Sequence, residues 1–429
     1  MDEVVKTVFQ EAERRQDEVT NLCSELVKFP SVNPPGMTSD VVEYIHSYFD
    51  DVDLPCEVLE REAGKSNLCV RLQGEKAGTI LWLGHLDVVP AGDRSLWHAD
   101  PFGGNLIGDR VYGRGASDMK GACASAMVAA KILSRMTPDH RCTVEFWFTC
   151  DEETGAENGV KWLSETGRLR GNVCLIGDSS CELPRHPTID VGCKGYLHIA
   201  LKASGVTAHG SQPFLGDNAI DKLITAADSA KRVEELRLDV PASLEPVIRS
   251  TLDDLKSAIH LRPDQLAKLE RIFHYPTASL NMITGGVKIN VVPDHAEAEL
   301  DVRVTPGVDL DAVKNRLVAL VKNSGVTEVE VAFTRSQGGY YEDPNSPAMT
   351  EFIKAVEIAT NAPPTLKLLS GGTDAVHLKA NVDIPCLGFG VGVQGMAHVS
   401  NEYTTVKNLV SGTKVYAVFP HLYSVDGSP

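Results

Sequence analysis

The sequence predicts an α/β protein in which a mainly parallel sheet carries helices on both faces and is interrupted by a smaller α+β domain. Two observations support this prediction. In the first part of the chain, short apolar segments alternate with helix-like segments, which is typical of a parallel sheet covered by helices. Near Cys193 the pattern changes to alternating apolar and polar residues, which is typical of antiparallel strands with one face in water.

The elements of the larger domain follow in order. An N-terminal stretch with helical periodicity precedes the apolar strands NLCVRLQG and TILWLGHLDVV. An Ala-rich stretch from Ala116 to Leu133 predicts a helix, and CTVEFWFTC predicts a buried strand. A short helix near 160–165 and the strand NVCLIGD complete this part. Ligands of such sheets bind beyond the carboxyl ends of the strands, so those ends are where a site is expected.

The smaller domain begins where GCKGYLHIALKASG alternates, and DHAEAELDVRV alternates in the same way. Between them, two helical segments are expected, and Pro263 suits the first turn of the second. After Pro306, we expect VEVAF, IPCLGFGVG and the helix MTEFIKAVEIAT to complete the first sheet. The predicted domains are therefore 1–193 with 306–429, and 194–305 with a helical insertion near 230–275.

Composition excludes several classes of protein. A chain of 429 residues predicts two domains, and a net charge of −17 argues against nucleic acid or an anionic membrane as partner, because both require a basic face. No apolar run has the length of a membrane span, and the N-terminus lacks the pattern of a signal peptide. The ten cysteines occur singly, which predicts reduced, buried thiols and a cytoplasmic location.

Acidic and histidine side chains follow the predicted strands at their carboxyl ends. TILWLG leads to His85 and Asp87, FWFTC leads to three acids at 151–153, and a Gly-rich loop, YGRGASDMKG, supplies Asp118. VCLIG leads to Asp178, and IPCLGFG leads through a loop to His398. Each piece alone has a simpler explanation, since adjacent acids often form a solvated turn and Asp often caps a helix. Their shared placement at one edge of a sheet favours a common site.

Nitrogen and oxygen ligands of this kind suit zinc, with cobalt or manganese as substitutes. The set is large enough for two ions, and Asp118 is the carboxylate that both ions would share. In H-x-D, Asp87 lies on the same side of an extended chain as His85, so we expect its carboxylate to accept the second ring N–H of that histidine. Neighbouring side chains diverge, so we assign Glu153 as a ligand and Glu152 as a general base.

The chain resembles the zinc aminoacylase and carboxypeptidase family that includes acetylornithine deacetylase and succinyl-diaminopimelate desuccinylase. The matching stretches span most of the chain from about Leu81 to Glu402 in family order. They are GHLDVVPAG, WHADPFGG, VYGRGASDMKGA, DEETG, IGDSS, GVTAHGSQP, GGVKINVVPD, DVRVTPG, GGTDA and AHVSNE.

The resemblance implies a role for each matching residue. It implies two zinc ions, one held by His85 and Asp178, the other by Glu153 and His398, with Asp118 between them. It implies that Glu152 is the general base and that Asp87 orients a ligand. It further implies that the smaller domain is a lid that forms a homodimer and contributes an oxyanion-stabilising histidine. The lid histidine and the implied substrate-binding residues are His209, Asn290, Arg303, Gly371, Gly372 and Thr373.

The implied activity is removal of the acyl group from a small N-acyl amino acid, and the alternative is a dipeptidase or carboxypeptidase with the same two metals. A noncatalytic binding protein on this scaffold is a more distant alternative, because a pure binder needs no Glu152. A nucleotide-binding loop at YGRGASDMKG is disfavoured, because the third glycine of the phosphate-binding pattern is missing. The chain departs from several family members at Val376, where they carry an arginine that can hold a substrate carboxylate.

Overall fold

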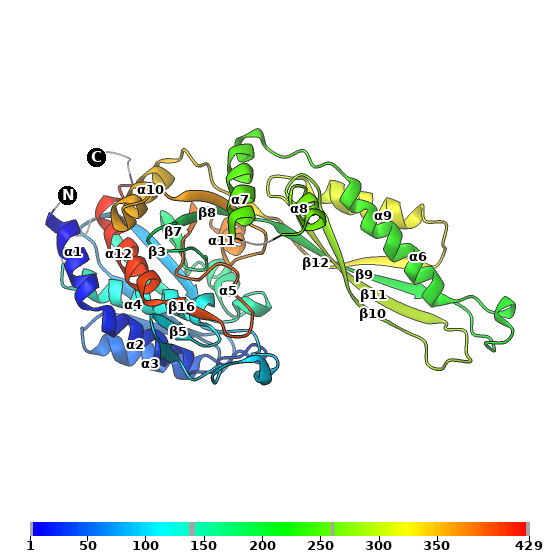
Figure 1. Cartoon of the computed structure of the whole chain (residues 1–429), viewed down its shortest axis with the longest axis horizontal. Helices are drawn as coiled ribbons and strands as arrows, with labels where there is room; N and C mark the ends of the chain where they lie inside the picture. The colour runs from blue at the N-terminus through cyan, green and yellow to red at the C-terminus, as the bar shows by residue number, and fades with distance from the viewer. Residues whose placement is uncertain (1–2, 137–141, 259–260, 426–429) are drawn as a thin grey trace. The chain divides into compact units, whose positions relative to one another are not determined.

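A computed structural model describes residues 3–136, 142–258 and 261–425 (Figure 1). The chain forms two compact units. The first comprises Met1–Val191, Glu342–Lys367 and Thr373–Pro429, and the second comprises Gly192–Tyr341 and Leu368–Gly372. The second unit therefore continues past residue 305, where the sequence placed its end.

The first unit is built on a sheet whose strands lie in the order β1-β2-β6-β3-β7-β15-β8. The four central strands, β6, β3, β7 and β15, are parallel, and antiparallel strands flank them on both sides. Residues 80–85 of β3 and all residues of β6, β7 and β15 are buried and mostly apolar, as the sequence predicts for this type of sheet. The bounds are β1 Cys56–Glu60, β2 Ser66–Leu72, β3 Lys76–His85, β6 Cys142–Thr149, β7 Val173–Ile176, β8 Thr188–Cys193 and β15 Cys386–Gly388.

Helices pack on this sheet, and the central one is α4. Its Ala-rich sequence suits the position, because α4 contacts β3 and β6 on one side and α2 and α12 on the other. Helices α1 and α10 pack on α12, whereas α5 packs on α11. The bounds are α1 Glu3–Arg14, α2 Gln16–Val27, α3 Ser39–Asp50, α4 Gly121–Ser134, α5 Val160–Glu165, α10 Pro347–Thr360, α11 Ala375–Asn381 and α12 Val406–Leu422.

Short elements complete the first unit. A small antiparallel sheet has the order β16-β5-β4, and its strand β5 is followed directly by the loop that carries Asp118. Strand β14 pairs with β8, and its last two residues, Leu368 and Leu369, belong to the second unit. The bounds are η1 Arg94–Leu96, β4 Asn105–Ile107, β5 Arg110–Tyr112, η2 Ala116–Lys120, η3 Glu152–Thr154, β14 Thr365–Leu369 and β16 Tyr403–Thr405.

The second unit is an antiparallel sheet with the order β10-β11-β9-β12. Along β11, alternate residues from Ala296 to Val304 are buried, and α6 and α9 cover that face (Figure 1). The alternation in the sequence therefore predicts these strands correctly. The bounds are β9 Gly195–Ser204, η4 Pro213–Leu215, α6 Ala219–Lys231, η5 Arg232–Glu235, η6 Ala242–Leu244, α7 Glu245–Ala258, α8 Pro263–Leu269, β10 Thr277–Gly285, β11 His295–Val304, α9 Leu310–Lys322, β12 Val329–Gln337 and β13 Tyr340–Tyr341.

One strand was assigned to the wrong sheet. The segment VEVAF lies in β12, which pairs with β9 in the second unit instead of completing the first sheet. Its residues Val329, Val331 and Phe333 pack against the core beneath α6 and α9. An apolar strand of this length suits the edge of either sheet, so its sequence pattern does not distinguish them.

The helical insertion lies in the second unit as predicted, with α7 and α8 as its two helices and Pro263 at the first position of α8. All ten cysteines are free thiols, and all but Cys56 are buried. Among the described residues, no helix is long and apolar enough to span a membrane.

Candidate metal centre

Three parallel strands bring ligand-type side chains to one edge of the first unit's sheet. His85 is the last residue of β3 and pairs with Thr149, the last residue of β6. Strand β7 is in register with β3 as far as Ile176, two residues before Asp178. After β6 the chain turns at Asp151, whose φ of 70° is left-handed, and enters η3. The carboxyl ends of these strands therefore present His85, Asp178 and the Glu152–Glu153 turn together.

Asp118 reaches the same place from the loop between β5 and α4. The backbone of Asp118 is not helical, with φ −129° and ψ 93°, and its side chain makes no capping hydrogen bond to α4. Gly115 has a φ of 91°, and a Cβ there would lie 2.7 Å from Val88 Cγ1. The loop therefore requires glycine at that position, and the structure gives Asp118 no capping role.

The carboxylate of Asp118 lies between two histidines. Its Oδ1 lies 3.1 Å from His85 Nε2, and its Oδ2 lies 3.1 Å from His398 Nε2. His398 Nε2 also lies 3.2 Å from a carboxylate oxygen of Glu153. Candidate ligand atoms within 4.8 Å of one another form two groups that share Asp118, and a third that contains Glu152. These groups are His85 with Asp118 and Asp178, Asp118 with Glu153 and His398, and His85 with Glu152 and Glu153.

The electrostatics of this cluster are those of crowded, buried carboxylates. Burial raises the pKa of Glu152 and of Asp178 well above their ordinary values, and neighbouring carboxylates raise them further. Burial alone would also raise the pKa of Asp118, but hydrogen bonds from His398 and His85 outweigh it and lower that pKa. Hydrogen bonds to Asp118 and Glu153 raise the pKa of His398 to about 10. The cluster thus attracts positive charge, and a cation would relieve the repulsion among its carboxylates.

The structure corrects the expected role of Asp87. The acceptor for His85 Nδ1–H is the main-chain carbonyl of Asp87, at 2.9 Å, whereas its carboxylate Oδ1 is 3.7 Å away. That carboxylate instead accepts the main-chain N–H groups of Glu152 and Glu153, each at 3.1 Å, because the turn after β6 directs them toward it. Hence the carbonyl leaves His85 Nε2 free as a ligand, and the carboxylate holds the Glu152–Glu153 turn.

Asn33 was not identified from the sequence, although it contacts this arrangement directly. Its Nδ2 lies 2.8 Å from Asp87 Oδ2 and 3.1 Å from Asp151 Oδ1. Asp151, the first of the three adjacent acids, also accepts from the main chain and side chain of Asn158, both at 3.0 Å. Asp151 is therefore a structural residue of the turn, and Asn33 links it to Asp87. Asn33 and Asp151 are 118 residues apart, so no local motif indicates their contact.

A small cavity adjoins the cluster, lined in part by His85, Glu152 and Asp178. Thr373 also lines it, and its buried hydroxyl has no hydrogen-bond partner among the described residues. Asp374 completes this wall, and burial raises its pKa to about 7. Of the three residues expected in the 371–373 loop, Thr373 thus lies beside Glu152, whereas Gly371 and Gly372 are exposed in the second unit.

The remaining expected site residues lie in the second unit. His209 is exposed, and its Nδ1 accepts from the main-chain N–H of Ser211 at 3.2 Å. The adjacent Gly210 donates to the main-chain carbonyl of Asn290 at 2.8 Å, so His209 and Asn290 belong to neighbouring loops. Arg303 pairs with Asp301 at 3.0 Å and stacks over Tyr196, with 5.5 Å between its guanidinium and the ring centre.

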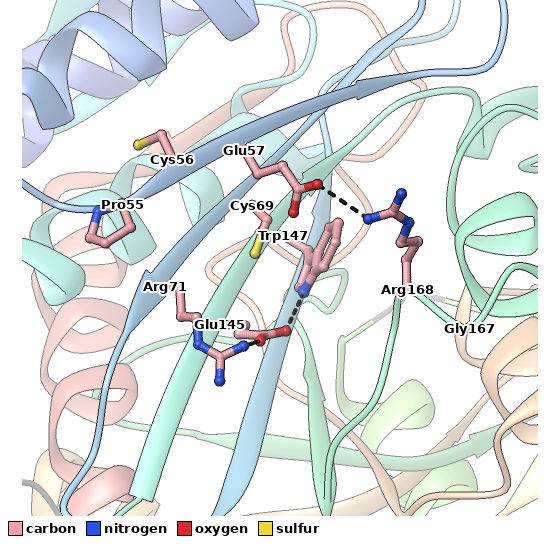
Figure 2. Close-up of a pocket in the computed structure, with 9 residues that line it drawn as sticks. All are labelled: Pro55, Cys56, Glu57, Cys69, Arg71, Glu145, Trp147, Gly167 and Arg168. Carbon is pink, nitrogen blue, oxygen red and sulfur yellow. Dashed lines mark hydrogen bonds and ion pairs between the residues drawn. The ribbon is translucent and has the colours of Figure 1, made fainter.

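A larger groove of about 360 Å³ lies elsewhere on the first unit (Figure 2). Its charged groups pair with one another: Arg71 with Glu145 at 2.7 Å, and Arg168 with Glu57 at 3.2 Å. Trp147 also donates to Glu145 at 3.0 Å. The charges in this groove are already paired. The cluster around Asp118 differs, because several of its buried carboxylates repel one another.

The chain is similar to known proteins over most of its length. A family model described as Peptidase family M20/M25/M40 matches residues 81–421. A succinyl-diaminopimelate desuccinylase of Rhodospirillum centenum is 28% identical over 404 residues, covering 92% of this chain and 94% of that protein. Two solved structures share the fold over nearly their full length. The M20 family metallo-carboxypeptidase Sso-CP2 from Sulfolobus solfataricus has a TM-score of 0.77 at 20% identity, covering 98% of this chain and 99% of its own. The di-peptidase Dug1p from Saccharomyces cerevisiae has a TM-score of 0.80 at 16% identity, covering 100% of both chains.

Proposed function

The chain belongs to Peptidase family M20/M25/M40, and from this premise we propose that it removes the acyl group from an N-acyl amino acid by hydrolysing the amide bond. The observation that carries the proposal is the pair of ligand groups that share Asp118, with Glu152 beside them. The desuccinylase from Rhodospirillum centenum supports this substrate class, because its similarity extends over 92% of this chain.

We propose that the site holds two zinc ions. His85 and Asp178 would hold one, Glu153 and His398 the other, and both would share Asp118. The ligand types and the separate histidine that faces each Asp118 oxygen fit this arrangement. When bound, Zn²⁺ supplies Lewis-acid polarisation of a carbonyl and makes water a stronger acid. Cobalt or manganese would serve as substitutes.

Glu152 is proposed as the general base. Its carboxylate lines the cavity next to the ligand cluster, and the main chain beneath it is held by Asp87. Burial and neighbouring carboxylates raise its pKa, which strengthens it as a proton acceptor when it is ionised. It would take a proton from the attacking water and return it to the leaving amine. Thr373 lines the same cavity, and its hydroxyl has no hydrogen-bond partner within the part of the chain that the structure describes; it is proposed to bind the substrate.

The second unit is proposed as a lid that forms a homodimer. Its edge strand β10 exposes Leu280, Met282 and Ile283 by 37%, 57% and 52%, and such an apolar edge favours pairing with another chain. His209 is proposed to donate from Nε2 to a developing oxyanion, and the main-chain N–H of Ser211, which donates to Nδ1, supports this role. Asn290, Arg303, Gly371 and Gly372 are proposed to contact substrate. The buried free thiols support a reducing compartment such as the cytoplasm.

Glu152→Ala tests the central assignment. The variant should retain the metal content of the wild-type protein, because the proposed ligands remain, while losing about 10²- to 10⁴-fold in kcat. Metal content measured by mass spectrometry and turnover of an N-acyl amino acid provide the two readings. Loss of metal in proportion to activity would assign Glu152 as a ligand and refute its role as a base.

A further inference from the structure

Glu402 is a buried carboxylate that contacts the Asp118 loop from a distant part of the chain. Its exposed fraction is 0%, and it lies four residues after His398. Its Oε1 accepts the main-chain N–H groups of Gly115, Ser117 and Asp118 at 3.0, 2.9 and 3.0 Å. Its Oε2 accepts from the guanidinium of Arg114, itself only 2% exposed. The Glu402 carboxylate therefore accepts four hydrogen bonds from residues 114–118.

The Asp118 loop needs such an acceptor because its own geometry does not supply one. Asp118 and Met119 have non-helical backbone angles, so the N–H groups before them do not all enter a helical ladder. Buried N–H groups without an acceptor are costly, and a carboxylate that accepts several of them forms strong bonds. The main-chain carbonyl of Glu402 also accepts from Gly113 at 2.9 Å. The side chain and the main-chain carbonyl of Glu402 thus both accept hydrogen bonds from this loop.

Arg114 makes the burial of this carboxylate tolerable. Its guanidinium neutralises Glu402 and lies 5.4 Å from the ring centre of Trp97. Burying a carboxylate without a cation would cost several kcal/mol of desolvation free energy, so we treat Arg114 and Glu402 as one ion pair. The Arg114–Glu402 ion pair joins the segment just before Asp118 to the segment just after His398. Asp118 and His398 are themselves in contact, with 3.1 Å between Asp118 Oδ2 and His398 Nε2.

We infer that Glu402, held by Arg114, is a positioning residue that sets the Asp118 carboxylate between its two histidines. This inference rests on the proposed function, since it assigns Asp118 as the shared metal ligand. Glu402 does not itself join any of the ligand groups, so it acts through the backbone of Asp118. Residues that orient metal ligands typically change metal affinity by about 10- to 100-fold when substituted.

Titration with Co²⁺ tests this inference. Glu402→Gln keeps the size of the side chain, but its neutral amide has a single oxygen, so it cannot accept from both the three loop N–H groups and the Arg114 guanidinium. Dissociation constants would be measured by competition with a chromophoric chelator, and the visible absorption of bound Co²⁺ would report ligand geometry. Glu145→Gln is the matched control, because Glu145 is 6% exposed, pairs with Arg71 and lines the groove of Figure 2.

The expected result is two Co²⁺ ions bound by the wild-type chain, and a rise of about 10- to 100-fold in at least one dissociation constant for Glu402→Gln. The Co²⁺ absorption should change shape in that variant and not in Glu145→Gln. If Glu402→Gln fails to fold, Arg114→Lys, which retains the charge but loses the fork of donors, should show the same change to a smaller degree.

Unchanged affinity and absorption in the folded Glu402→Gln variant, or in Arg114→Lys if that variant replaces it, would overturn the inference. An equal loss of affinity in Glu145→Gln would also overturn it, because the effect would then follow general stability. A wild-type chain that binds fewer than two Co²⁺ ions would instead refute the proposed two-metal site.

Discussion

Asn33 offers a quantitative test of how the site is held. Its buried amide nitrogen lies 2.8 Å from Asp87 Oδ2, 3.1 Å from Asp151 Oδ1 and 3.0 Å from Thr154 Oγ1. An amide has two N–H donors, so it serves two acceptors at a time. Asp87 and Asp151 are only 0% and 3% exposed, and each would lose a donor that water does not replace.

Asn33→Ala should destabilise the first unit by about 3–5 kcal/mol, because each hydrogen bond to a charged group contributes about 1.5–3 kcal/mol. Part of the loss is offset by Lys65, whose Nζ lies 3.6 Å from Asp151. The turn that carries Glu152 depends on Asp87, so kcat should also fall, by about 10²-fold for a shift near 1 Å. Asn33→Asp should be worse at neutral pH, since it adds a third carboxylate to the two already buried there.

Tryptophan fluorescence during urea unfolding isolates this effect. The four tryptophans, Trp82, Trp97, Trp147 and Trp162, all lie in the first unit, so their signal does not report the second. Glu145→Gln provides the control, because it perturbs the same unit and should leave kcat unchanged. A loss below about 1 kcal/mol for Asn33→Ala, with unchanged kcat, would refute the reasoning that Asn33 holds Asp87 and the Glu152 turn.

Three further results are expected. Asp118→Ala should deplete both metals in elemental analysis, and unchanged zinc content would contradict a shared ligand. Mixing the inactive His209→Ala and Glu152→Ala variants should restore partial activity if His209 acts across a dimer, and no recovery despite proven subunit exchange would count against that role. Burial, reinforced by Arg303, lowers the pKa of Lys194 from 10.5 to about 7, so the folded state disfavours the charged amine. Lys194→Met should therefore stabilise the second unit by about 2–5 kcal/mol below pH 7, and this gain should vanish near pH 10.5. Hydrogen exchange in β9 and β11 would measure the gain. A gain that does not change with pH would contradict the lowered pKa of Lys194.

The parallel core could be predicted from the sequence because its signal is local. Buried parallel strands are continuous apolar runs, and the carboxyl ends of such strands meet at one edge of a sheet. Reading β3, β6 and β7 to their ends therefore brings His85, Asp178, Glu152 and Glu153 together, as the structure does, whereas Asp151 holds the turn instead. The Ala-rich stretch likewise predicts a helix, and most residues of α4 are buried in the structure.

The partners of individual polar groups could not be predicted, because they depend on contacts between distant parts of the chain. Glu402 meets the N–H group of Asp118 from 284 residues away, and Asn33 meets Asp87 from 54 residues away. The spacing of His85 and Asp87 suggests a side-chain contact, but the chain after β3 places a carbonyl there. The sheet that β12 joins depends in the same way on packing against α6 and α9, not on its own alternation.

The most direct test of the central claim is amine release from a panel of N-acetyl, N-succinyl and longer-acyl amino acids alongside dipeptides. Zinc or cobalt would be supplied, and Glu152→Ala would be the control. We expect turnover of acyl amino acids by the wild-type chain and almost none by the variant. Turnover confined to dipeptides would contradict the proposed deacylase and establish a peptidase, and equal turnover by the variant would contradict the proposed base.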